Sequence, residues 1–213
     1  MTRFNNFITL KKDDEEEFNS IFIENLKKEC APYLKMVKGK ELYRGIEGED
    51  SAYIKKKVRT NRKPKDTPIE IHEYLDKELH RRFGWYPRSN GMFATSNFGE
   101  ADIFGEVFVV FPVGPVKYLW NTKTEDIYKW LSDLFRNMVD PSWSIKRDWY
   151  RASKEQREDF MKTISGKHSI IDNYTNKGLQ NAIEKEHEIV FNCKEYYGIE
   201  KGTYIKIKEG IFK

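Results

Sequence analysis

Apolar residues spaced three or four positions apart predict two helices in the N-terminal half of the chain. The first covers residues 14–30 and is followed by a short turn that ends at Val37. The second begins at residues 67–70, which read Thr-Pro-Ile-Glu, a capping box with proline at the first helical position. Its apolar stripe continues to Gly84, so this helix is the clearest one in the sequence.

Short runs of aromatic and β-branched residues predict strands. One strand is expected at Leu42–Arg44, before a polar stretch, residues 47–66, that is predicted as a loop. The runs GMFATS and EVFVVFPVG follow, with a helical turn at 99–104 between them, and another strand is expected at 116–120. Near the C-terminus, HEIVFNC and TYIKIK predict two strands that are joined by the turn-like stretch YYGIEKG.

Residues 120–180 are expected to be mainly helical. One helical face starts behind Thr124 and ends near Met138, and a second helix is capped by Ser153 and runs to Ile164. Strands interspersed with helices over 213 residues predict a single α+β domain that covers residues 1–213.

Composition favours a folded protein with no strong bias in its partners. The chain has 14 Phe, 12 Tyr and 5 Trp, which are side chains suited to a large core. Its 38 basic residues exceed its 34 acidic residues by four, which is far from the charge of a dedicated nucleic-acid binder. Cys30 and Cys193 form neither a disulfide framework nor a metal motif, and no secretory signal or membrane-spanning run is evident. A cytoplasmic setting and no membrane association are therefore expected.

Three short motifs contain candidate functional residues. In Tyr43-Arg44-Gly45, an arginine ends a strand, and its planar fork binds a diphosphate well, although a surface turn has the same appearance. Thr95 and Ser96 end another strand, where they either contact a ligand or cap a helix.

The third motif is Glu186-His187-Glu188, which leads into an apolar run. A strand period would place both glutamates on one face, where they could act on one substrate, or they could form an ordinary solvated edge.

These motifs together resemble the Arg-Ser-Glu class of ADP-ribosyltransferases. The matching stretches are LYRGI, FATSNFGEADIFGEVFVVFPVGP and EKEHEIVF, in that order along the chain. The hydroxyl motif reads A-T-S where the family more often has S-T-S. The resemblance implies mixed or antiparallel sheets of the ADP-ribosyltransferase type, with residues 1–40 as an N-terminal helical extension and residues 120–180 as a helical insertion.

The resemblance also implies an activity. The chain would be a mono-ADP-ribosyltransferase that uses NAD as substrate, needs no metal and transfers ADP-ribose to a protein or nucleic-acid acceptor. Glu188 would stabilise the oxocarbenium-like ribose, and Glu186 would orient or deprotonate the acceptor. The chain resembles a bacteriophage-encoded effector, which would act as a monomer in the host cytoplasm.

The same resemblance assigns NAD-binding residues. Arg44, with Tyr43 beside it, would hold the diphosphate. Thr95 and Ser96 would fix the nicotinamide ribose and support Glu188, which makes Ser96 part of the catalytic set.

A basic run, residues 55–65, leaves three interpretations open. It could bind the phosphates of NAD, with Arg59 and Arg62 as the candidate contacts, or it could bind DNA or RNA, or it could be a solvated loop. The second interpretation is the alternative function, a non-enzymatic nucleic-acid-binding module.

Other notable side chains are interpreted as structural. His72 and His80 are expected at the surface or its boundary, because no histidine falls at a metal-binding spacing. An aromatic group near the predicted insertion is expected to belong to the core rather than to stack on a base. Its members are Trp120, Tyr128, Trp130 and Phe135.

Overall fold

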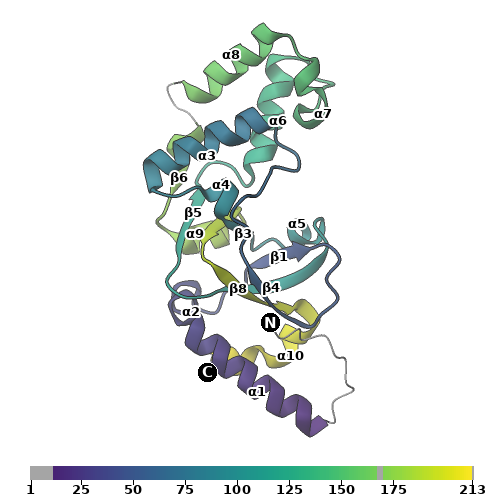
Figure 1. The fold of residues 1–213 in the computed structure, drawn as a ribbon, viewed down its shortest axis with the longest axis vertical. Coiled ribbons are helices and arrows are strands. Elements are labelled where there is room, and N and C mark those ends of the chain that lie inside the picture. The colour runs from purple at the N-terminus through teal and green to yellow at the C-terminus, as the bar shows by residue number, and fades with distance from the viewer. Residues whose placement is uncertain (1–11, 167–169, 213) are drawn as a thin grey trace.

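The computed structural model describes residues 12–166 and 170–212, which form two four-stranded antiparallel sheets flanked by helices (Figure 1). The strands are β1 (Tyr43–Ile46), β2 (Tyr53–Lys57), β3 (Met92–Ala94), β4 (Glu106–Pro112), β5 (Lys117–Asn121), β6 (Tyr174–Thr175), β7 (Ile189–Asn192) and β8 (Glu195–Glu200). The α-helices are α1 (Lys12–Glu29), α2 (Ala31–Val37), α3 (Ile69–Phe83), α4 (Pro87–Asn90), α5 (Phe98–Asp102), α6 (Ile127–Met138), α7 (Ile145–Asp148), α8 (Lys154–Ser165), α9 (Leu179–Glu184) and α10 (Lys201–Phe212). Two 3₁₀ helices complete the set, η1 (Trp149–Arg151) and η2 (Ile170–Asn173). The α+β prediction is confirmed.

The two sheets meet at the ends of β1 and β3. The first sheet has the order β1-β4-β8-β2 and the second has the order β3-β7-β5-β6. The Tyr43 N–H donates to the Thr95 carbonyl at 2.6 Å, and the Thr95 N–H donates back to Tyr43 at 3.0 Å. This bridge holds the strand that carries Arg44 against the strand that ends in the two hydroxyl residues.

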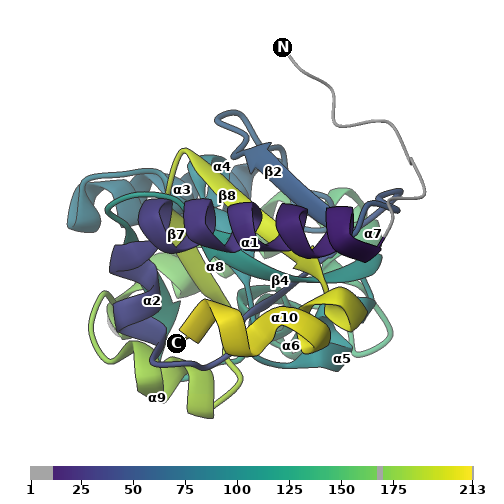
Figure 2. The same cartoon turned by 90° about the horizontal axis from the view of Figure 1, so that it is seen from below.

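The described residues form two hydrophobic cores, and the second sheet contributes to both of them. In the first sheet, β4 is buried on both faces because every residue after Glu106 is apolar, which suits its position between β1 and β8. Helices α1, α2, α9 and α10 pack side chains into the first core, to which β3, β5 and β7 of the second sheet also contribute. Figure 2 shows α1 and α10 lying across the first sheet. Helices α3, α6 and α8 cover the second sheet at the opposite end of the molecule (Figure 1).

The predicted helices are present, but two of their caps differ from the sequence interpretation. The Thr67 hydroxyl does not cap α3, which follows Pro68 without a side-chain cap. Thr67 is instead buried and accepts a hydrogen bond from Arg88 Nη2 at 3.4 Å. Asp126, rather than Thr124, caps α6, whereas the Ser153 capping box of α8 is confirmed.

Three strand predictions were wrong. The polar stretch 47–66 contains β2, which pairs with β8 and turns Ile54 inward while Lys55 and Lys57 stay exposed. The supposed turn YYGIEKG contains most of β8, because its apolar residues lie between β4 and β2. TYIKIK belongs to α10, whose first turn is stabilised by the Glu200 carboxylate on the Thr203 N–H at 2.8 Å.

Candidate functional site

Arg44 connects the two sheets. It lies in the middle of β1, and its Nη1 donates to the Phe93 carbonyl of β3 at 2.7 Å. Its Nε is buried and has no hydrogen-bond partner among the described residues. The guanidinium is therefore held in place by Nη1, while Nε has no partner in the described part of the chain.

Glu188 lies one residue before β7 and close to Arg44. Its backbone N–H donates to the Glu125 carbonyl at 2.8 Å, which fixes the approach to the strand. Burial raises the pKa of Glu188 to about 7, and the nearby charge of Asp126 raises it further, whereas Arg88, Arg62 and Arg44 act in the opposite direction. The sequence motifs that contain Arg44 and Glu188 thus meet in space.

Arg62 reaches the same cluster from the basic run. Its backbone N–H donates to the Ser89 carbonyl at 3.1 Å, and its guanidinium lies 4.2 Å from the centre of the Phe93 ring. Burial lowers its pKa to about 10, and the positive charge of Arg44 adds to that effect. Arg62 still carries its charge at neutral pH, and its Nη1 has no partner among the described residues.

Arg88 completes the group, although the sequence analysis did not identify it. This residue of α4 is only 9% exposed, and its Nε is a third guanidinium nitrogen without a partner in the described part of the chain. Its backbone N–H donates to Asp76 Oδ1 of α3 at 2.7 Å. No periodic signal marks a residue in a one-turn helix, and Pro87 alone indicates only a turn.

His72 of α3 is buried near Arg88 and Arg62, so the prediction that it would be a surface or boundary residue was wrong. It is 4% exposed, and its Nε2 lies 3.4 Å from the Ser89 hydroxyl oxygen. Burial and the charges of Arg88 and Arg62 lower the pKa of His72 to about 4, so the ring is neutral at pH 7. His80 does lie at the boundary, where it stacks on Tyr86.

We call Arg44, Arg62, Arg88, Asp126 and Glu188 the arginine cluster. It contains three cations and two carboxyl groups. Each arginine has one buried nitrogen without a partner among the described residues. An unpaired buried donor costs roughly 1–3 kcal/mol, so a ligand with several anionic oxygens would relieve a real deficit. Arg44, Arg62, Asp126 and Glu188 are each partly exposed as whole residues, whereas Arg88 is buried.

Tyr43 lies on the opposite side of β1 from Arg44, because adjacent strand residues point to opposite faces. Its hydroxyl donates to Glu41 Oε2 at 2.5 Å and accepts from Lys201. Tyr43 lines a shallow hollow of about 350 Å³ together with Ser96 and Glu186. The structure therefore separates Tyr43 from the arginine cluster.

The hydroxyls of Thr95 and Ser96 bind the turn that precedes Glu188. Thr95 Oγ1 donates to the Glu186 carbonyl at 3.2 Å, and Ser96 Oγ donates to the Ile183 carbonyl at 2.6 Å. Neither residue caps α5, because that role belongs to Asn97. Their visible contribution is to hold the segment that carries Glu188.

Glu186 and Glu188 do not share a strand face, so that expectation was wrong. Glu186 precedes β7 in a left-handed conformation with φ of 59°. Its exposed carboxylate accepts a hydrogen bond from Asn97 Nδ2 at 2.8 Å. The turn breaks the two-residue alternation on which the prediction depended.

The rest of the basic run is only partly available to a ligand. Lys55 pairs with Glu29 at 2.5 Å, and Lys56 pairs with Glu49 at 2.7 Å. Arg59 is exposed and close enough to Arg62 to influence its pKa.

The aromatic residues near the helical segment belong to the two cores, as predicted. Trp120 and Phe135 are buried, and Tyr128 and Trp130 pack against the second core.

Within residues 12–166 and 170–212, no group of three or more His, Cys, Asp and Glu side chains is arranged to bind a metal ion. No helix of that same part is both long and apolar enough to cross a membrane.

No protein-family model, curated protein or solved structure matches this chain.

Proposed function

We propose that this chain is an NAD-dependent mono-ADP-ribosyltransferase that cleaves the nicotinamide–ribose bond and transfers ADP-ribose to a macromolecular acceptor. One observation supports this most strongly. Arg44 and Glu188, from motifs far apart in the sequence, lie in one cluster where the two sheets meet. That cluster combines guanidinium donors that have no partner among the described residues with the Glu188 carboxyl group, and these are the groups needed for a diphosphate and for a cationic sugar.

In this proposal the three arginines bind the diphosphate of NAD. A diphosphate offers several acceptor oxygens and negative charge, and guanidinium groups bind such oxygens through paired hydrogen bonds. The donors assigned to it are the nitrogens of Arg44, Arg62 and Arg88 that have no partner among the described residues. Arg88 is thus added to the two arginines expected from the sequence, and Arg59 stays at the periphery.

Glu188 would act on the ribose. Bond cleavage builds positive charge on the sugar ring, and an ionised carboxylate beside it lowers the energy of that state. A pKa of about 7 leaves a substantial fraction of Glu188 ionised at neutral pH. The side chain would therefore become more effective as the pH rises through neutrality.

The remaining motif residues would prepare this arrangement or meet the acceptor. Thr95 and Ser96 would hold the Glu188 segment through the hydrogen bonds described above. Glu186 is exposed in the hollow that Tyr43 and Ser96 also line, and we assign it to the acceptor nucleophile. Cleavage of this glycosidic bond by carboxylates requires no metal.

The alternative is a non-enzymatic nucleic-acid-binding module that uses residues 55–65. It would depend chiefly on the exposed cations of this run that form no ion pair among the described residues. These are Lys57, Arg59 and Lys63. Such binding would weaken steeply with salt and would not require Glu188.

The proposal is tested by incubating the purified protein with NAD and a cell lysate, and by following both nicotinamide release and transfer of labelled ADP-ribose. We expect release and transfer by the wild type and by the control Glu155→Gln, an exposed carboxylate of α8. Glu188→Gln should abolish both. If neither wild type nor variants turn over NAD, and NAD leaves the melting temperature unchanged, the enzyme assignment fails.

A further inference from the structure

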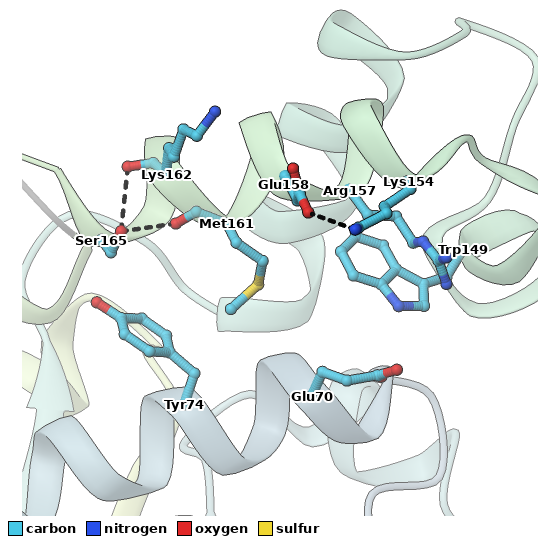
Figure 3. A pocket seen from close by; sticks show the side chains of 9 residues that line it. All are labelled: Glu70, Tyr74, Trp149, Lys154, Arg157, Glu158, Met161, Lys162 and Ser165. Carbon is cyan, nitrogen blue, oxygen red and sulfur yellow. Dashed lines mark hydrogen bonds and ion pairs between the residues drawn. The ribbon is translucent and has the colours of Figure 1, made fainter.

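A second concave site lies between α3 and α8, away from the arginine cluster (Figure 3). Its volume is about 560 Å³, within the roughly 300–1,000 Å³ typical of small-molecule pockets. Trp149, Met161 and Tyr74 supply its apolar surface. Glu70, Lys154, Arg157, Glu158, Lys162 and Ser165 supply its polar rim. We call this site the α3–α8 pocket.

The Trp149 indole brings a buried hydrogen-bond donor to this pocket. Trp149 is 2% exposed, and its Nε1–H has no acceptor among the described residues. Figure 3 shows that nitrogen on the side of the indole that faces the gap between α8 and α3. Because buried indole N–H groups usually find a partner, this donor indicates an acceptor that enters from the pocket.

Arg157 places a positive charge beside the indole (Figure 3). Lys154 pairs with Glu158 at 3.7 Å, and Lys162 pairs with Asp159 at 2.9 Å. Arg157 is partly buried and forms no ion pair within the described part of the chain. The Arg157 guanidinium and the Trp149 indole N–H are both hydrogen-bond donors. A ligand that binds to both of them therefore needs a negatively charged acceptor group.

We propose that the α3–α8 pocket binds a small apolar acid, meaning an apolar body that carries one oxyanion group. The body packs against Met161 and Tyr74. The oxyanion accepts hydrogen bonds from Trp149 Nε1 and Arg157. This assigns a binding role to the predominantly helical segment 120–180, whose contribution the sequence did not indicate.

This site is separate from the proposed NAD site, although both use α3. Tyr74 faces the pocket, whereas His72 and Asp76 contact the α4 region beside the arginine cluster. Residues two positions apart lie about 200° apart around a helix, so the two sites are on different sides of α3. The inference therefore does not depend on NAD chemistry.

The test uses two fluorescent probes that differ in charge. One is 1-anilinonaphthalene-8-sulfonate, and the other is N-phenyl-1-naphthylamine, which has the same ring system without the sulfonate. The wild type should bind the sulfonate saturably at one site per chain and more tightly than the neutral probe. Arg157→Gln should weaken sulfonate binding about tenfold, the effect of losing one charge-assisted hydrogen bond, and leave the neutral probe unchanged.

Two variants keep the result interpretable. Arg136→Gln removes an exposed arginine of α6 that does not line the pocket, and it should bind both probes like the wild type. Trp149→Phe keeps an aromatic ring but removes the N–H, so it should also weaken sulfonate binding, provided that its melting curve shows a folded protein. Equal binding of the two probes, unchanged sulfonate binding by Arg157→Gln, or no saturable binding by the wild type would overturn the proposal.

Discussion

At the residue scale, Glu188 couples the stability of the fold to pH. Its pKa is raised from an ordinary value of 4.5 to about 7, chiefly by burial. Between pH 4.5 and about 7, the folded chain holds a proton on Glu188 that the unfolded chain has released. The free energy of unfolding therefore falls as the pH rises from about 5 to 7. His72 has the opposite effect over lower pH values, because burial lowers its pKa to about 4.

Glu188→Gln should reduce this pH dependence. The glutamine cannot ionise, so the variant should become more stable relative to the wild type as the pH rises to 7, by roughly 1–3 kcal/mol. Urea unfolding at pH 5, 6 and 7 measures the difference, and comparing the two proteins cancels the contribution of His72. A constant difference across this range would show that the Glu188 carboxyl titrates normally.

Arg88 also gives a prediction at this scale. If its Nε, which has no partner in the described part of the chain, contacts the diphosphate, Arg88→Gln should weaken NAD binding about 10- to 100-fold, the range for a lost charge-assisted hydrogen bond. Isothermal titration calorimetry with NAD measures this, with Arg136→Gln as the control. Wild-type affinity in a folded Arg88→Gln variant would remove Arg88 from the proposed site.

At the element scale, the sequence predicted those helices and strands whose apolar spacing agrees with their burial. The clearest examples are α3, α6 and β4, because their apolar residues repeat with the correct period. Prediction failed for α10, where the alternation in TYIKIK imitates a strand. It failed for β2 because a run of lysines gave no apolar signal, although pairing with β8 makes it a strand.

Helix caps were also predicted only in part. The capping side chain can be recognised in the sequence, but the partner that it bonds to depends on the folded structure. The α8 capping box has both expected hydrogen bonds, Gln156 N–H to Ser153 Oγ at 3.1 Å and Ser153 N–H to Gln156 Oε1 at 2.8 Å. Thr67 had an equally good sequence pattern, but Arg88 uses its hydroxyl. Sequence alone cannot reveal that competition, because Arg88 reaches Thr67 only in the folded chain.

Ser153→Ala should therefore lower the free energy of unfolding by about 1 kcal/mol, the usual effect of losing an N-cap. Ser20→Ala, on an exposed position inside α1, is the control and should be neutral or slightly stabilising. Chemical denaturation of the three proteins gives the comparison. Equal losses from both substitutions would mean that the Ser153 cap contributes nothing specific.

At the scale of the whole molecule, the candidate site exists because two sheets meet. The bridge between Tyr43 and Thr95 brings β1 to the end of β3, and β7 pairs with β3, so Arg44 and Glu188 come together. Motif order along the chain was enough to select these two residues. Arg88 and His72 could not be found in this way, because a one-turn helix and the buried side of α3 bring them to the site.

The most direct test of this account is the rate of nicotinamide release from NAD, measured as kcat/KM between pH 5.5 and 8.5. We predict that the wild-type value rises with a midpoint near pH 7, where Glu188 ionises, and that Glu188→Gln shows no release at any pH. Equal release by the wild type and by Glu188→Gln would contradict the central claim that Glu188 acts on the ribose within the arginine cluster.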